Sequence, residues 1–206
     1  MKQDLVDENN YPLFEGIINL RKSRMKTEDV IAKYPKIFVD YEGNPGQCNW
    51  YGVPDGWLPI IDDLCGSIQD YIDYTSRSYD NPEYIEGKPY DKNDPTTWKY
   101  LQKHAEQVTC SQMKEKFGGL RFYARNEDDN VMGMIRMAEY LCDHTCQECG
   151  TRENVGMITK GWITTICNAC TIPLGDRAIE SWQSLKEFYA AREKRKQELD
   201  ESKTNI

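Results

Sequence analysis

The sequence predicts an α+β fold: a helical N-terminal part, a short antiparallel sheet around residues 117–125, and a C-terminal module that ends in a long helix. Three observations favour this class. Apolar residues recur at helical spacing over 57–74 and 131–142, whereas apolar and polar residues alternate over 120–125, as in a half-buried strand. Two C-x-x-C pairs then precede a strongly helix-forming tail.

Composition excludes several classes of protein. The 206 residues are 39% hydrophobic and 11% aromatic, which is enough to bury a core. No apolar run reaches the roughly 18 residues that a membrane span needs. The polar, acidic N-terminus is unlike a signal peptide, so we expect a cytoplasmic protein. The net charge of -8 argues against non-specific binding to duplex DNA, which needs a basic surface.

The first predicted elements are two helices. One runs from Phe14 to about Lys26, with Phe14, Ile17 and Ile18 on its apolar side. Its C-terminal end is basic, which suits the helix dipole, and the cations there are Arg21, Lys22, Arg24 and Lys26. A second short helix is predicted from Thr27 to Tyr34, because Pro35 stops it.

The middle of the chain alternates between turn-rich segments and helices. Residues 42–56 are rich in Gly and Pro and predict turns. Asp55 can cap the helix predicted over 57–74, in which Cys65 lies on the apolar stripe as an inert core thiol. Residues 75–96 contain three prolines and predict a mobile loop, either partner-contacting or a tolerated insertion. A short helix is predicted over 97–108.

The predicted strand presents one apolar face and one basic-aromatic face. Leu120, Phe122 and Ala124 form the apolar face, and Gly118-Gly119 allow a tight turn before the strand. The apolar positions of the helix that follows are Val131, Met134, Ile135, Ala138, Leu141 and Cys142.

Cations around the Gly-Gly turn form a candidate anion or partner site. The residues are Lys114, Lys116, Arg121, Tyr123 and Arg125. The cations could cradle an anion such as a phosphate, and the tyrosine ring could stack on a ligand. The alternative is a solvated strand face with weak salt bridges to Glu115 and Glu127.

The two cysteine pairs are the strongest motif of the chain. Cys146 and Cys149 are separated by 17 residues from Cys167 and Cys170. Two such pairs complete a tetrahedral thiolate shell around one structural Zn²⁺ and leave no position open for a substrate. Gly150 eases the turn after the first pair. The alternatives are a redox pair or chance placement, and His144 could replace one cysteine ligand.

A β-hairpin is predicted between the pairs, over residues 156–166 around Lys160-Gly161, and the second pair opens a helix. This order of knuckle, hairpin and helix resembles the treble-clef zinc finger, and the cysteine spacing is similar to that of GATA-type fingers. The resemblance implies an alternative function, nucleic-acid binding, whose candidate phosphate contacts are Lys160, Arg192, Lys194, Arg195 and Lys196.

The distribution of charge favours a protein partner over nucleic acid. Residues 146–206 hold nine basic and nine acidic residues, so the remaining 17 basic and 25 acidic residues, and the whole net charge, lie before Cys146. A phosphate-gripping surface needs a basic excess, which this neutral segment does not have. We therefore predict an acidic body over residues 1–143 and a zinc module over 144–206.

Three segments resemble a family of uncharacterised bacteriophage and bacterial proteins. They are the sequences YPLF at residues 11–14, DGWLPIID at 55–62 and KEKFGGLRFY at 114–123, followed by the paired cysteines. The order and spacing match over roughly residues 11–175. The resemblance implies zinc binding and a phage or bacterial origin, but no mechanism.

Catalytic groups are scarce in the sequence. The two histidines are His104 and His144, and only Cys110 and Cys142 lie near them, without a group that would orient the base. We therefore predict a zinc-stabilised intracellular interaction protein that binds a host or phage protein. An enzyme that acts on a phosphate-containing substrate through the Gly-Gly strand is a further alternative.

Overall fold

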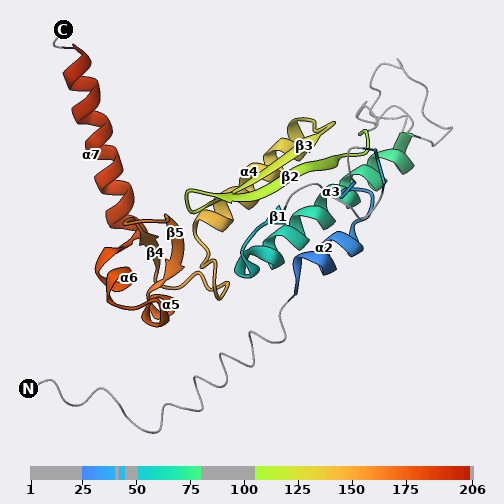
Figure 1. The fold of residues 1–206 in the computed structure, drawn as a ribbon. Helices are drawn as coiled ribbons and strands as arrows, with labels where there is room; N and C mark the ends of the chain where they lie inside the picture. The colour runs from blue at the N-terminus through green and yellow to red at the C-terminus, as the bar shows by residue number, and fades with distance from the viewer. Residues whose placement is uncertain (1–24, 40–41, 45–50, 80–104, 205–206) are drawn as a thin grey trace, which may run out of the picture.

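The computed structural model describes residues 25–39, 42–44, 51–79 and 105–204 (Figure 1). The helix predicted from Phe14 falls almost entirely outside these residues, as do His104 and most of the segment predicted as a loop. The described residues confirm the predicted α+β class, with two short sheets and a long C-terminal helix.

The first sheet has the strand order β1-β2-β3, formed by Tyr51–Gly52, Thr109–Lys116 and Gly119–Arg125. β1 pairs parallel to β2, and β2 pairs antiparallel to β3. One face of the sheet packs on α3 (Leu58–Tyr79) and α4 (Asp129–Asp143), and α2 (Thr27–Lys33) packs on α3. Figure 1 shows α3 and α4 running beside the two long strands.

The main core lies between these helices and the sheet. Its largest fully buried side chains include Trp57, Phe38, Ile61, Met113 and Leu120. Burying an aliphatic or aromatic side chain of this kind contributes about 1.5–3 kcal/mol. Cys65 is also fully buried, and burial raises the pKa of its thiol, which confirms the prediction of an inert core cysteine.

The structure extends α3 beyond its predicted end. The helix continues to Tyr79, into the segment predicted as a loop. Thr75 is 1% exposed, and its hydroxyl donates to the carbonyls of Tyr71 and Ile72, so a residue that often ends helices is satisfied within this one. The helix starts after a 3₁₀ turn, η2 (Asp55–Trp57).

Strand β2 was not predicted. The helix predicted over 97–108 was wrong for residues 105–108, which are the part of it that the structure describes. Residues 105–108 form no helix but lead into β2, with Val108 fully buried. The register of β2 shifts between Cys110 and Gln112. This irregularity breaks the alternation of apolar and polar residues that identifies a strand.

A two-residue turn joins β2 to β3. Phe117 and Gly118 both have positive φ, at 55° and 79°, which is the hairpin geometry that matches the twist of paired strands. The turn therefore lies one residue earlier than predicted, and Gly119 begins β3, paired with Lys116.

The second sheet belongs to the C-terminal part and has the order β5-β4-β6. The predicted hairpin is confirmed as β4 (Val155–Ile158) and β5 (Thr164–Cys167), which pair antiparallel. The prediction that the second pair opens a helix is confirmed by α5 (Asn168–Thr171), which is followed by the 3₁₀ turn η4 (Ile172–Leu174) and α6 (Asp176–Ser181).

Apolar residues recur at helical spacing near the C-terminus, at Ile179, Trp182, Leu185, Phe188 and Tyr189, but they do not lie on a single helix. Strand β6 (Trp182–Ser184) interrupts this pattern, because Trp182 packs over Gly156 and its indole N–H donates to Ile166 O at 2.9 Å. The tail helix α7 (Leu185–Thr204) then begins with a capping box, in which Ser184 N donates to Glu187 and Glu187 N donates to Ser184 Oγ. Figure 1 shows α7 extending away from the second sheet.

Candidate metal centre

Four cysteine side chains meet between the end of α4 and the second sheet. Cys146 and Cys149 lie in a tight loop after α4, Cys167 ends β5, and Cys170 lies in α5. Their sulfur atoms all lie within 4.8 Å of one another, and the Sγ atoms of Cys149 and Cys167 are 3.6 Å apart. A disulfide needs about 2.05 Å, and none of these four cysteines forms a disulfide.

This arrangement is close enough to hold one metal ion. Thiolates about 2.3 Å from a tetrahedral zinc ion are separated by roughly 3.8 Å. Cys146, Cys167 and Cys170 are buried, and Cys149 is half-buried, so the protein surrounds the cluster on most sides. Such a closed thiolate set suits a structural ion rather than one that binds a substrate.

Backbone hydrogen bonds build the loop of the first pair. Gly150 N donates to Cys146 O at 2.9 Å, and Cys146 N donates to Thr151 O at 2.9 Å. Cys149 N donates to Cys146 Sγ at 3.4 Å, a contact that stabilises a thiolate. Gly150 has φ of 72°, so glycine relieves strain at the position predicted from the sequence.

Electrostatics disfavour four thiolates in the cluster when no cation is bound. Burial, followed by the charge of Cys146 and the hydrogen bond with Cys167, raises the pKa of the Cys170 thiol. Four thiolates this close repel one another unless a cation lies between them. Metal binding should therefore release protons, because the ligands bind as thiolates.

Residues of η2, the 3₁₀ turn just before α3, hold the cysteine loop through hydrogen bonds. Gly56 N donates to Gln147 O at 2.9 Å, and Trp57 Nε1 donates to Thr145 O at 2.9 Å. Gly56 fits only because it lacks a Cβ, which would lie 2.3 Å from Cys146 O. These two contacts were not predicted, although both residues belong to the DGWLPIID segment quoted above.

His144 does not join the cysteine cluster. Its Nδ1 lies 2.8 Å from Tyr140 O, and its ring packs between those of Tyr140 and Tyr189, at centroid distances of 4.3 and 6.1 Å. It is the residue at which α4 ends. Among the described residues the metal-ligating group is the four cysteines alone.

The structure brings together only part of the predicted anion site. Lys114 pairs with Arg121 across the two strands, and Lys114 Nζ lies 5.4 Å from the centre of the Tyr123 ring. Lys116 instead lies over Phe117, and Arg125 pairs with Thr109 at the far end of the hairpin. In the part of the chain that the structure describes, none of these cations forms an ion pair with Glu115 or Glu127.

The Gly-Gly turn makes structural contacts rather than offering free amides. Gly118 N donates to the Glu115 carboxylate at 2.6 Å, and Gly118 O accepts from Thr165 Oγ1 at 2.6 Å. Glu115 also accepts from Trp162 Nε1 at 3.2 Å. The turn therefore packs on the hairpin of the C-terminal part, and anion binding there stays a prediction.

The predicted nucleic-acid contacts are exposed but spread over two elements. Lys160 lies in the turn between β4 and β5, whereas Arg192, Lys194, Arg195 and Lys196 lie on α7. Lys194 lies 4.0 Å from Glu198, one helical turn later. Acidic residues therefore interleave with the cations of α7, as the sequence indicates.

The predicted thiol nucleophile candidates are buried. Cys110 is 1% exposed and Cys142 is fully buried, and burial, with smaller effects of Asp143 and Glu139, raises the pKa of the Cys142 thiol. A thiol of this kind is a poor nucleophile because the thiolate is disfavoured. Both cysteines therefore act as small apolar core residues.

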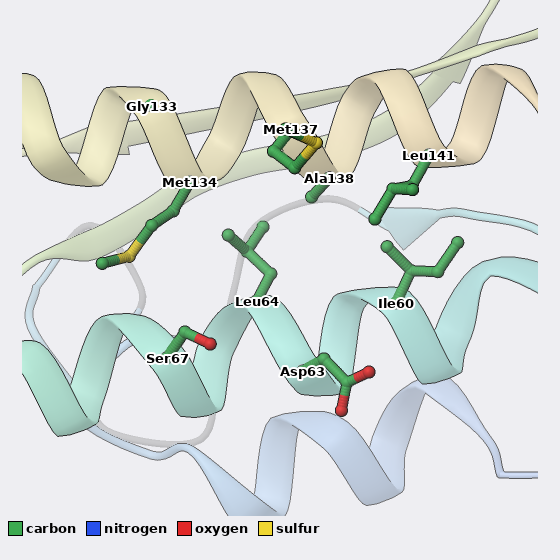
Figure 2. A pocket seen from close by; sticks show the side chains of 9 residues that line it. All are labelled: Ile60, Asp63, Leu64, Ser67, Gly133, Met134, Met137, Ala138 and Leu141. Carbon is green, nitrogen blue, oxygen red and sulfur yellow. The ribbon is translucent and has the colours of Figure 1, made fainter.

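An apolar groove between α3 and α4 was missed by the sequence analysis. Figure 2 shows Met134 and Leu141 of α4 reaching toward Leu64 and Ile60 of α3, with α2 on the other side of α3. The groove has a volume of about 420 Å³. Met137 on its α4 side is 59% exposed, which the apolar periodicity did not indicate because this residue lies beyond the predicted stripe.

No family model, curated protein or solved structure matches this chain. Within the described residues, no helix combines the length and the apolarity needed to cross a membrane.

Proposed function

We propose that the cysteine cluster is a structural zinc site in a treble-clef module. The order of elements supports this: a tight loop with the first pair, the β4–β5 hairpin, and the second pair at the start of α5. All four ligands are sulfur atoms, which zinc accepts in closed structural sites. A second, smaller core cluster in the C-terminal part also supports it, because three of its seven buried residues are cysteines. The seven residues are Cys146, Val155, Ile158, Ile166, Cys167, Cys170 and Ala178.

The function that we propose is protein interaction, with zinc stabilising the fold. The observation that carries this proposal is the apolar groove between α3 and α4, which leaves Met137 largely exposed on an acidic body. Exposed apolar surface of this kind is typical of binding sites, and methionine side chains adapt to different partners. A basic amphipathic helix of a host or phage protein has the matching chemistry.

Metal analysis tests the first proposal. The purified protein should contain one zinc per chain, and the double variant Cys146→Ser, Cys149→Ser should contain none. Cys142→Ala is the matched control, because Cys142 is a buried cysteine outside the cluster. A metal-free protein that melts at the same temperature as the metal-loaded one would contradict a structural role.

Affinity capture tests the second proposal. The immobilised full chain should recover one stoichiometric partner from cells, and Met137→Glu should lose it. Tyr140→Glu is the control, since Tyr140 lies on the same helix, is 56% exposed and does not line the groove. If Met137→Glu and Tyr140→Glu recovered the partner equally well, the groove would not be its binding site. Repeated capture without any partner would contradict the proposed interaction function.

A further inference from the structure

We propose that residues 12–24 of this chain cover the groove between α3 and α4 in the free protein. In this arrangement Phe14, Ile17 and Ile18 occupy the groove, and the basic residues after them lie on an acidic ridge of α3. The inference deepens the proposed function, because the groove is the surface that we assign to the partner. The segment and the partner then compete for the same surface.

The groove has the shape and the chemistry to take apolar side chains. Its walls include Ile60 and Leu64 from α3 and Met134, Met137 and Leu141 from α4. Gly133 widens it, since a Cβ built there would meet no atom within 4 Å. Among the described residues nothing covers Met137, whose side chain is 59% exposed. Apolar surface of this kind gains free energy when another apolar segment covers it.

An acidic ridge separates the groove from α2. Residues 58–75 of α3 contain four aspartates and no lysine or arginine. Asp62 pairs with Lys33 of α2 at 2.8 Å, whereas Asp63 and Asp70 are exposed and pair with no cation in the described part of the chain. A basic segment that crosses α3 would therefore meet unpaired carboxylates.

The chain leaves α2 on the correct side to reach the groove. Met25, just before α2, packs against the main core, and α2 lies on the Asp62 side of α3. A segment that starts there has to cross one helix, which is about 10–12 Å wide with its side chains. Residues 19–24 span up to roughly 20 Å when extended, so Ile17 and Ile18 can reach the groove.

The segment carries the pattern that the groove and the ridge require. Phe14, Ile17 and Ile18 recur at helical spacing, and Arg21, Lys22 and Arg24 follow directly. Between Asn9 and Lys26 the only acidic residue is Glu15. Apolar anchors at this spacing are typical of a helix that lies in a groove. Attachment to the same chain gives an effective concentration on the order of 1 mM, so weak intrinsic affinity suffices.

Hydroxyl-radical footprinting of Met137 in the full chain tests the covering. Ile17→Asp should raise the oxidation rate of Met137 at least threefold. Asn19→Asp is the control, because it adds the same charge in the same segment off the apolar stripe, and it should leave the rate unchanged. Met157, which is 5% exposed, reports on global unfolding and should stay protected in both variants. Equal Met137 rates in the two variants would overturn the proposal.

The reciprocal experiment measures amide hydrogen exchange in residues 12–24. In the full chain, amide hydrogen exchange over residues 12–24 should be slowed, and Met137→Glu should accelerate it whereas Tyr140→Glu should not. Exchange at the rate of an unstructured peptide in the unmodified protein would overturn the proposal. Protection that disappears on dilution would also overturn it, in favour of a second copy as the occupant.

These readouts need no partner, so they separate this inference from the proposed function. If both hold, Ile17→Asp captures more partner than the unmodified chain does. Capture that yields no partner contradicts the proposed function and leaves the footprinting result standing. Capture that is the same with Ile17→Asp and with the unmodified chain contradicts competition and counts against the covering.

Discussion

The indole Nε1 of Trp57 donates a 2.9 Å hydrogen bond to the backbone carbonyl of Thr145, 88 positions later in the chain. Trp57 is fully buried, and Thr145 directly precedes the first cysteine of the cluster. The main core and the loop of the cysteine cluster therefore share one buried hydrogen bond. A substitution that destabilises the main core should therefore also destabilise the cysteine loop, and the reverse should hold.

Replacing Trp57 tests this coupling. Trp57→Phe leaves the Thr145 carbonyl without its donor and opens a small cavity, so the free energy of unfolding should fall by about 2–4 kcal/mol. Urea unfolding measures the change, and release of the metal to a chelator should become faster. Trp162→Phe is the control, because Trp162 is 76% exposed. An unchanged rate of metal release would disprove the coupling.

Gly56→Ala should be strongly destabilising although it adds only one methyl group. The new Cβ would lie 2.3 Å from Cys146 O and 2.6 Å from Gln147 O, which are backbone atoms that cannot turn aside. The cysteine loop must shift, so we expect a lower melting temperature and weaker metal affinity. Asp55→Ala changes the neighbouring exposed residue and should retain both. Normal metal affinity in Gly56→Ala would show that the loop adapts.

Removing the metal should affect the two cores differently. Three of the seven buried residues of the second cluster are cysteines, so chelation at neutral pH should accelerate amide exchange in β4 and β5. Exchange in α3 and α4 should change much less, because the main cluster has its own apolar contacts. Mass spectrometry of exchanged peptides measures both regions. Uniform acceleration over the whole chain would mean that the fold is one cooperative unit.

Asp143 should make stability depend on pH. Burial raises the pKa of its carboxyl, and Arg121 and His144 offset this only in part. A raised pKa in the folded state means that the folded protein binds more protons, so stability falls as pH rises through this window. Asp143→Asn should therefore raise the melting temperature at pH 7, with a gain that shrinks as the pH falls toward about 4. The control is Asp129→Asn at an exposed position of the same helix.

The same gain at every pH, or a loss of stability, would show that the charge of Asp143 is compensated in the folded protein. The metal content of both variants is measured at each pH, so that loss of metal in acid is not mistaken for this effect.

The helices and the cysteine pairs could be predicted because their signals are local. The apolar period predicts α3 and α4, and the cysteine spacing predicts which four sulfurs meet. Strand β2 was missed because its register shifts near Cys110, and β6 because Trp182 continues a helical stripe. The groove was missed because it forms only when two helices that are distant in the sequence lie side by side.

The exposed helix α7 has a practical consequence for experiments on this protein. Its 20 residues correspond to about 30 Å of length, and the capping box at Ser184 fixes the point from which it departs. Residues 190–202 are all exposed, and α7 extends away from the second sheet (Figure 1). A fluorophore or an affinity tag attached after Ile206 should therefore be tolerated, whereas one at Met1 would alter the segment proposed to cover the groove.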